Sequence, residues 1–308
     1  MRSLSTARVL LIALGVIVVA SFLPLWVTGY ILGLLTIAYY FGVFAMAWDL
    51  LFGFAGEVNF GPTFLIGTGG YTAGILDSLY QPPIWICLVA GALAAVTGGV
   101  VLALPALRVR GPYFGLTTLV AVLILQNFVV VAAGLTGGEI GLTVPDVISI
   151  SDTTNYEIAL WFMAVSGAIL FSLSRSPVGL ILQASGQDAV QAGALGFNVT
   201  KHKLAAFIIS AFFSGLAGAL LVFYLGTATV GTLVDITVGV QIIIAAVLGG
   251  RRTILGGVLG AIFLIAMSEV LRPLGDLSNF VVFAMALIVV LLFPGGFFGL
   301  LTGTKESG

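Results

Sequence analysis

The 308-residue chain contains one cysteine and one histidine, too few for the sites these residues usually build. Cys87 has no second cysteine with which to form an internal disulfide, so it says nothing about the redox compartment. His202 lies between Lys201 and Lys203 with no second histidine or cysteine nearby, and we interpret it as a solvated residue rather than a metal ligand. There is no GxxxxGK(S/T) phosphate loop and no histidine available for a Ser-His-Asp triad. We therefore expect no catalytic residue, no metal site, no cofactor bound by this chain and no nucleic-acid partner.

Charged residues are also scarce. They make up 7% of the chain, whereas a soluble domain has about 25%. Hydrophobic residues make up 60%, and the mean hydropathy is +1.23. Water could not solvate such a surface but lipid can, so the composition predicts an all-α integral membrane protein.

Ten apolar stretches are long enough to cross a hydrocarbon core, which takes about 20 residues per helix, or a few fewer when flanking side chains snorkel. They span residues 9–27, 30–52, 62–80, 83–104, 113–134, 157–173, 204–225, 236–248, 254–271 and 279–293. No composition shift separates them, so we expect a single transmembrane domain, residues 1–308, of about ten helices.

Positive charge is distributed unevenly over the breaks between these segments. With the N-terminus in the cytosol, the cytosolic side receives every cation but one. The cytosolic set is Arg2, Arg8, Arg108, Arg110, Arg175, Lys201, Lys203, Arg251, Arg252 and Lys305, and the exception is Arg272. This distribution predicts that both termini are cytoplasmic.

The first segment has an alternative interpretation as a cleaved signal peptide, because Arg2 and Arg8 precede an apolar run and residues 18–20 loosely resemble a cleavage site. The run continues through Trp26, which is too long for a signal core. We therefore favour a retained helix.

Glycines crowd one helix boundary, between Gly53 and Gly70, where Pro62 also lies. Interrupted helices in transporters expose backbone groups to a substrate path. Glu57 and Asn59 lie in this break and are candidate path residues. Two readings stay open: a cytosolic turn in which Glu57 is solvated, or a break that dips into the membrane, where a carboxylate costs roughly 3 kcal/mol.

Gln126 and Asn127 lie near the middle of the fifth segment, where an amide that faces lipid is unfavourable. We expect either an interhelical hydrogen bond or a place on the substrate path. Asp49, Asp77 and Glu269 lie near segment ends, where a carboxylate can reach the headgroups, so none is expected to relay protons.

The longest cytosolic stretch covers about residues 174–203. Within it, residues 176–196 have apolar side chains at a three-to-four spacing and end at Gly196, which predicts one short amphipathic helix. Such a helix is either a plain connector or the surface on which a cytosolic motor pushes.

Five segments together resemble the LivM-type permease subunits of branched-chain amino acid ABC importers, in order and spacing over nearly the whole chain. They are GFAGEVNFGPTFLIGTGGYTAGIL (53–76), ALRVRGPYFGLTTL (106–119), TGGEIGL (136–142), SPVGLILQASGQDAVQAGALGFNVTKHKLAAFIISAFFSGLAGAL (176–220) and VLGGRRTILGGVLGA (247–261). The most specific part is ALGFNVT (194–200) with the helix that follows it.

The resemblance implies that the loop docks on an ATP-hydrolysing subunit. The implied docking residues are Asp188, Ala189, Ala192, Ala194, Leu195 and Gly196. Gly186 and Gly193 stand where the family usually has a basic and an acidic residue. Glu57, Asn59 and Pro62 stand where it often has Gln, Ser and His.

The resemblance also implies the function: a permease subunit, not an enzyme, that moves branched-chain or related hydrophobic amino acids across the prokaryotic cytoplasmic membrane by ATP-driven alternating access. Its implied partners are two ATP-binding subunits that use ATP and Mg²⁺, a second related permease, an extracytoplasmic substrate-binding protein and the lipid bilayer. A urea or short-amide permease of the same architecture is an alternative. An ion-coupled secondary transporter is another, although it should carry mid-membrane charges that this chain lacks.

Overall fold

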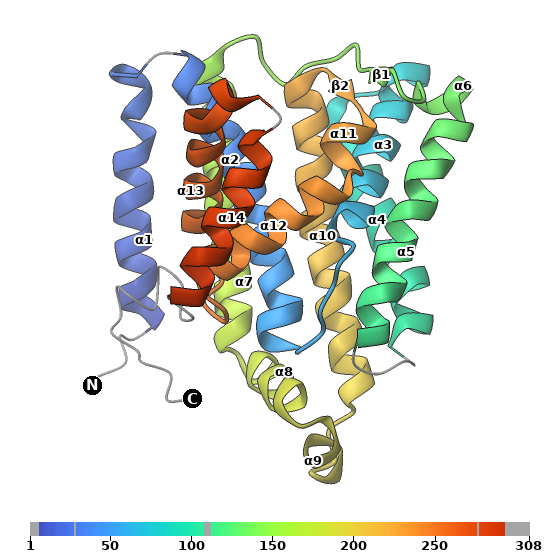
Figure 1. Cartoon of the computed structure of the whole chain (residues 1–308), viewed down its shortest axis with the longest axis vertical. Coiled ribbons are helices and arrows are strands. Elements are labelled where there is room, and N and C mark those ends of the chain that lie inside the picture. The colour runs from blue at the N-terminus through green and yellow to red at the C-terminus, as the bar shows by residue number, and fades with distance from the viewer. Residues whose placement is uncertain (1–5, 28, 108–111, 276, 293–308) are drawn as a thin grey trace.

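A computed structural model describes residues 6–27, 29–107, 112–275 and 277–292. Its long helices run roughly alongside one another and form a single layered bundle, with short elements at both ends (Figure 1). Apart from one two-residue ladder, the described elements are all helical. The predicted all-α class is therefore confirmed.

Each of the ten predicted apolar segments coincides with a helix. These are α1 (Thr6–Ser21), α2 (Gly29–Asp49), α3 (Pro62–Tyr80), α4 (Ile84–Ala106), α5 (Pro112–Val131), α7 (Asp152–Arg175), α10 (Val199–Leu225), α12 (Ile236–Gly249), α13 (Gly256–Leu271) and α14 (Leu277–Leu292). Within the described residues, seven helical segments are long and apolar enough to cross a membrane, and residues 11–25 form a shorter apolar helix. The helices α3 and α14 fall outside this set, because α3 is diluted by glycine and polar residues and α14 has only 16 residues.

Shorter elements connect the long helices. They are the single turns η1 (Leu23–Leu25) and η3 (Arg272–Leu274), the π-helical segment η2 (Leu50–Phe54), the helices α6 (Ala133–Thr136), α8 (Pro177–Gln187), α9 (Ala189–Ala194) and α11 (Val230–Leu233), and the strands β1 (Leu142–Thr143) and β2 (Thr227–Ala228). The two strands pair antiparallel, with Leu142 opposite Ala228. This ladder was not predicted, since two residues are too few for a strand pattern in the sequence.

Two helices begin five residues earlier than the apolar pattern indicated. The predicted segment at residues 157–173 starts at Asp152, because Ser151 caps the helix and accepts a hydrogen bond from the Thr154 amide. The segment predicted at 204–225 starts at Val199, because the Asn198 side chain accepts one from the Lys201 amide. Polar first turns carry no hydrophobic signal, so only the caps could have revealed these starts.

The long helix α10 lies at the centre of the bundle and packs against α2, α3 and α4 (Figure 1). Close approach of backbones holds this packing together. A Cβ atom on Gly218 would lie 2.5 Å from the Ile66 carbonyl oxygen of α3, and one on Gly260 would lie 1.9 Å from the Ala245 carbonyl oxygen of α12. Small residues permit such contacts in lipid, where the hydrophobic effect does not drive helices together.

The turn between α12 and α13 is held on the end of α2 by a buried carboxylate. Asp49 is 2% exposed; its Oδ1 accepts from the Arg252 amide at 3.0 Å and its Oδ2 from the Ile254 amide at 2.9 Å. Arg252 and Ile254 both have positive φ, 64° and 54°, which is costly for residues with side chains. The expectation that Asp49 reaches the headgroups was wrong, because this turn needs its oxygens. Asp77, also expected at the headgroups, is fully buried and accepts from the Asp146 amide at 3.1 Å.

We expect Asp49→Ala to lower the free energy of unfolding by at least about 2 kcal/mol, because two buried amide donors lose their acceptors. Asp49→Asn keeps one acceptor oxygen and should lose less. Unfolding of the purified chain by SDS titration in mixed micelles measures both. Equal stability of both variants and the wild type would contradict this role for Asp49.

Candidate functional site

The glycine-rich break predicted after the second helix is present. The last turn of α2 widens into the π-helical segment η2, and Gly56 then turns the chain with a φ of 72°. The chain from there to Gly61 is not helical and rises beside α10 to the start of α3 (Figure 1). In a membrane-spanning bundle, non-helical backbone is tolerated where protein covers it or where it lines a cavity.

Asn59, a predicted substrate-path residue, is used to shape this break. Its side chain is 1% exposed, and its Oδ1 accepts from the Gly61 amide at 2.8 Å. Its backbone carbonyl accepts from the Trp48 indole at 2.6 Å. These bonds fix the last residues before α3. Asn59 therefore positions the break, and its Oδ1 is already in use.

Glu57, the other candidate in the break, forms an ion pair with Lys203 on the first turns of α10. The Glu57 Oε1 and Lys203 Nζ atoms are 2.6 Å apart, and the two side chains are 16% and 14% exposed. Glu57 is therefore neither a solvated turn residue nor an isolated carboxylate. The pair joins the break to the central helix, and a spacing of 146 residues hid it from sequence analysis.

We expect Glu57→Gln and Lys203→Met each to destabilise the chain by about 1 to 2 kcal/mol, since each leaves a half-buried charge without its partner. The double variant should lose less stability than the sum of the losses of the two single variants. Lys201→Met is the matched control, because Lys201 is exposed on the same turn and should change stability by less than about 0.5 kcal/mol. Strictly additive losses in an SDS-unfolding cycle would show that the pair is not coupled.

Gln126 and Asn127 lie about two turns further along α5 from the residue that contacts the break. That residue is Thr118, whose Oγ1 accepts from the Phe60 amide at 3.0 Å. Asn127 is exposed and donates to the Leu123 carbonyl of its own helix at 2.8 Å. Gln126 is half-buried and makes no side-chain hydrogen bond within the described residues. The expected interhelical bond is therefore not formed by Asn127, and the structure does not bring these amides to Glu57.

The single amphipathic helix predicted at residues 176–196 is wrong, because the chain forms two helices there. It breaks at Asp188, which has φ −147° and ψ 101°. The Asp188 Oδ1 accepts from the amides of Val190 and Gln191, both at 2.9 Å, and so caps α9. An N-cap aspartate within an apolar periodicity was the signal for this break.

The short helix α9 is the element furthest from the bundle at its lower end, below α8 (Figure 1). Among the predicted docking residues, Ala189, Ala194, Leu195 and Gly196 are exposed and Ala192 is buried. Leu195, at the end of α9, is 75% exposed, and Val190, in its first turn, which the sequence analysis missed, is 73% exposed. Two large apolar side chains at the tip of a projecting loop form a surface suited to a protein partner.

The loop touches the break directly, through two glycines. A Cβ atom on Gly186 of α8 would lie 2.6 Å from the Phe54 carbonyl oxygen, and one on Gly56 would lie 2.8 Å from the Gly186 Cα. Backbone therefore packs on backbone where α8 meets the end of η2. A side chain at either position would push the two segments apart. Gly186, noted above only as a departure from the family pattern, makes this contact possible.

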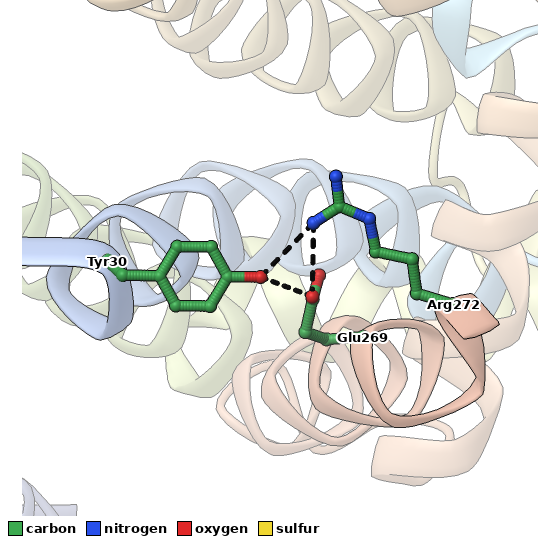
Figure 2. Close-up of polar contacts among 3 residues, drawn as sticks. All are labelled: Tyr30, Glu269 and Arg272. Carbon is green, nitrogen blue, oxygen red and sulfur yellow. Dashed lines mark hydrogen bonds and ion pairs between the residues drawn. The ribbon is translucent and has the colours of Figure 1, made fainter.

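The opposite end of the bundle holds the one cation predicted to lie outside. The Arg272 Nη1 donates to the Glu269 Oε1 at 3.2 Å and to the Tyr30 hydroxyl at 3.2 Å. The Tyr30 hydroxyl also donates to the Glu269 Oε1 (Figure 2). The exception to the charge asymmetry is thus neutralised locally, and the cluster joins the start of α2 to the end of α13.

Residues 30–292 match the family described as branched-chain amino acid transport system / permease component. The chain is similar to the high-affinity branched-chain amino acid transport system permease protein LivM of Escherichia coli, with 24% identity over 326 positions that cover 95% of this chain and 75% of LivM. LivH of Salmonella typhimurium is 24% identical over 290 positions, covering 84% of this chain and 91% of LivH. The ribose import permease protein RbsC of Haemophilus influenzae is 25% identical over 138 positions, 43% of each chain.

The family match covers most of the chain, including the break, the projecting loop and all seven membrane-length helical segments. It confirms the resemblance derived from the five sequence segments. The chain therefore belongs to the family of permease components of branched-chain amino acid transport systems, and it is a non-catalytic transport subunit of the cytoplasmic membrane.

Proposed function

We propose that this chain is one permease subunit of an ABC importer that carries branched-chain or related hydrophobic amino acids into the cell. It spans the membrane about ten times as one domain, residues 1–308, with both termini in the cytoplasm. The described cations Arg175, Lys203 and Arg252 support this orientation, because they lie at the end of the bundle opposite Arg272.

One observation carries the proposal: the loop that carries the exposed apolar tip on α9 also touches the helix break, through Gly186 of α8. Leu195 and Val190 project from α9, while Gly186 packs on the backbone of Phe54 and Gly56. Movement of a partner bound at the tip can therefore reach the membrane-embedded helices through this direct backbone contact. This arrangement suits a subunit driven by a separate motor.

The proposed partners are two ATP-binding subunits docked at α8–α9, a second related permease, and an extracytoplasmic binding protein at the opposite end. ATP and Mg²⁺ would be used in the ATP-binding subunits. Docking residues on this chain are Ala189, Ala194, Leu195 and Gly196, with Asp188 and Ala192 holding α9 in shape.

Mechanistically, the motor shifts this chain between outward-open and inward-open states by binding them with different affinity. When α8 moves, the Gly186–Gly56 contact and the Glu57–Lys203 pair carry the movement to the break and to the base of α10. The break can rearrange because its backbone is not part of a helical hydrogen-bond ladder. Glu57, Asn59, Gln126 and Asn127 remain candidates for the path itself.

The cargo is tested by transport in proteoliposomes that contain the whole complex and its binding protein. We expect vanadate-sensitive, ATP-dependent uptake of labelled leucine, isoleucine or valine. Uptake of urea or of a short amide in place of these would support the alternative cargo, and uptake of ribose would align the chain with its sugar-transporting relative. Uptake that resists vanadate but stops with an uncoupler would contradict the ATP-driven mechanism.

A further inference from the structure

A second polar feature lies at the cytosolic end of the bundle, beside the start of the break. It is an open pocket of about 500 Å³ lined by Phe54, Ser174, Arg175, Leu180, Gln183 and Arg252. Three membrane-length segments end at its walls: Gly29–Phe54, Asp152–Arg175 and, three residues before Arg252, Val230–Gly249. The pocket therefore lies at the depth where a bilayer has its headgroups.

The pocket contains two arginines and no carboxylate. Within the part of the chain that the structure describes, the two ion pairs are Glu57–Lys203 and Glu269–Arg272, so neither Arg175 nor Arg252 has a carboxylate partner. Asp49 lies nearby, but its oxygens accept from the backbone amides of the α12–α13 turn. The two guanidinium groups thus lack a neutralising anion from the protein.

Each guanidinium group already has one contact with the protein before any ligand arrives. The Arg252 Nε donates to the Gly53 carbonyl at 2.8 Å, which leaves its Nη edge available. The Arg175 guanidinium lies 5.2 Å from the centre of the Phe171 ring. Arginine held in this way binds phosphate oxygens through paired hydrogen bonds at little further entropic cost.

We infer that this pocket binds the phosphate of an anionic phospholipid from the cytoplasmic leaflet. Arg175 and Arg252 hold the phosphate oxygens, the Gln183 amide supplies a further donor, and Leu180 and Phe54 contact the apolar part next to the headgroup. Basic pockets between membrane helices on the cytoplasmic side are suited to such headgroups. A bound phosphate would tie the α7–α8 junction to the α12–α13 turn and so brace the base on which α8 moves.

The depth of the pocket favours a lipid over an acidic group of an ATP-binding subunit. The exposed tip at Leu195, where a cytosolic partner would dock, is on α9, further from the bundle (Figure 1). The inference rests on one part of the proposed function, the orientation that places this end of the bundle in the cytosol. It does not depend on the cargo or on ATP hydrolysis.

The test is native mass spectrometry of the purified full-length chain with added phosphatidylglycerol or phosphatidylcholine, alongside the melting temperature in the same lipids. We expect selective, stabilising binding of phosphatidylglycerol, weakened about tenfold or more in the variant that combines Arg175→Gln with Arg252→Gln. Arg175→Gln alone should weaken it several-fold without touching the Gly53 contact. Arg251→Gln, which removes the same charge beside the pocket, should bind like the wild type.

Three outcomes would overturn the assignment. One is equal binding of the two lipids, or binding that the arginine variants leave unchanged. Another is displacement of phosphatidylglycerol by millimolar inorganic phosphate, which would make the ligand a soluble anion. The third is loss of the lipid when the ATP-binding subunits assemble on the chain, which would make the pocket a protein-docking site.

Discussion

Substrate-stimulated ATP hydrolysis by the assembled complex is expected to fall to its basal level when Leu195 is replaced by aspartate. Leu195 is 75% exposed at the end of α9, where the proposed ATP-binding subunit would bury it. A carboxylate at the centre of an apolar contact loses the packing and must also be desolvated, roughly 3 kcal/mol or more in all, which weakens docking more than about 100-fold. ATPase activity with and without loaded binding protein measures this directly.

Membrane insertion should be unaffected by Leu195→Asp, because the side chain makes no buried contact in this chain. Ile150→Asp is the matched control, since Ile150 is 96% exposed in the loop at the opposite end of the bundle. The control variant should retain docking of the ATP-binding subunits, measured by co-purification, because its end of the bundle is proposed to face the binding protein instead. If Leu195→Asp keeps wild-type stimulation, the motor docks elsewhere.

The second large effect is expected at Gly186, where alanine should both destabilise the chain and reduce coupling. Its Cβ would meet the Phe54 carbonyl oxygen at 2.6 Å, and it would also lie 3.0 Å from the Gly56 amide nitrogen. These are backbone atoms that cannot rotate away, so α8 must move relative to the break. Overpacking of this kind should lower the free energy of unfolding by about 1 to 3 kcal/mol. SDS unfolding of the purified chain measures this loss.

Gly193→Ala provides the comparison within the same loop. A Cβ atom on Gly193 would meet nothing within 4 Å, and Gly193 lies in α9, so alanine should leave stability unchanged or raise it by up to about 1 kcal/mol. If one methyl group lowers stability at position 186 but not at position 193 of the same loop, the Gly186 contact is the cause of the loss. Equal stability of the two variants would show that α8 does not press on the break.

The sequence was sufficient for the long helices, because lipid-spanning segments carry their signal in uninterrupted apolar length. The predicted segment at residues 62–80 has the bounds that α3 has in the structure. The hydrophobic pattern failed to predict helix starts that are set by polar residues and N-caps. Asp188 looked like one polar position in an amphipathic helix, although an aspartate can also be an N-cap. The hydrogen bonds that its Oδ1 accepts from the amides of Val190 and Gln191 identify the helix start.

Contacts between distant segments could not be predicted from one sequence. Glu57 meets Lys203 across 146 residues, and Asp49 meets the turn at Arg252 across 203. Asp49 was assigned from its position near a helix end, where headgroups are the usual partners. Glu57 was assigned from its place in the glycine-rich break, as either a solvated turn residue or a membrane-dipping carboxylate. Tertiary packing supplied other partners: Glu57 pairs with Lys203, and Asn59 fixes the last residues before α3. Their place on a substrate path stays a prediction.

Site-specific photo-crosslinking from position 195 tests most directly whether this chain is driven from α9. A photoreactive amino acid at Leu195 should give a crosslink to an ATP-binding subunit in membrane vesicles, while the same probe at Ile150 should not. A crosslink from position 195 to the extracytoplasmic binding protein, or none to any ATP-binding subunit in an active complex, would contradict the proposed drive from α9.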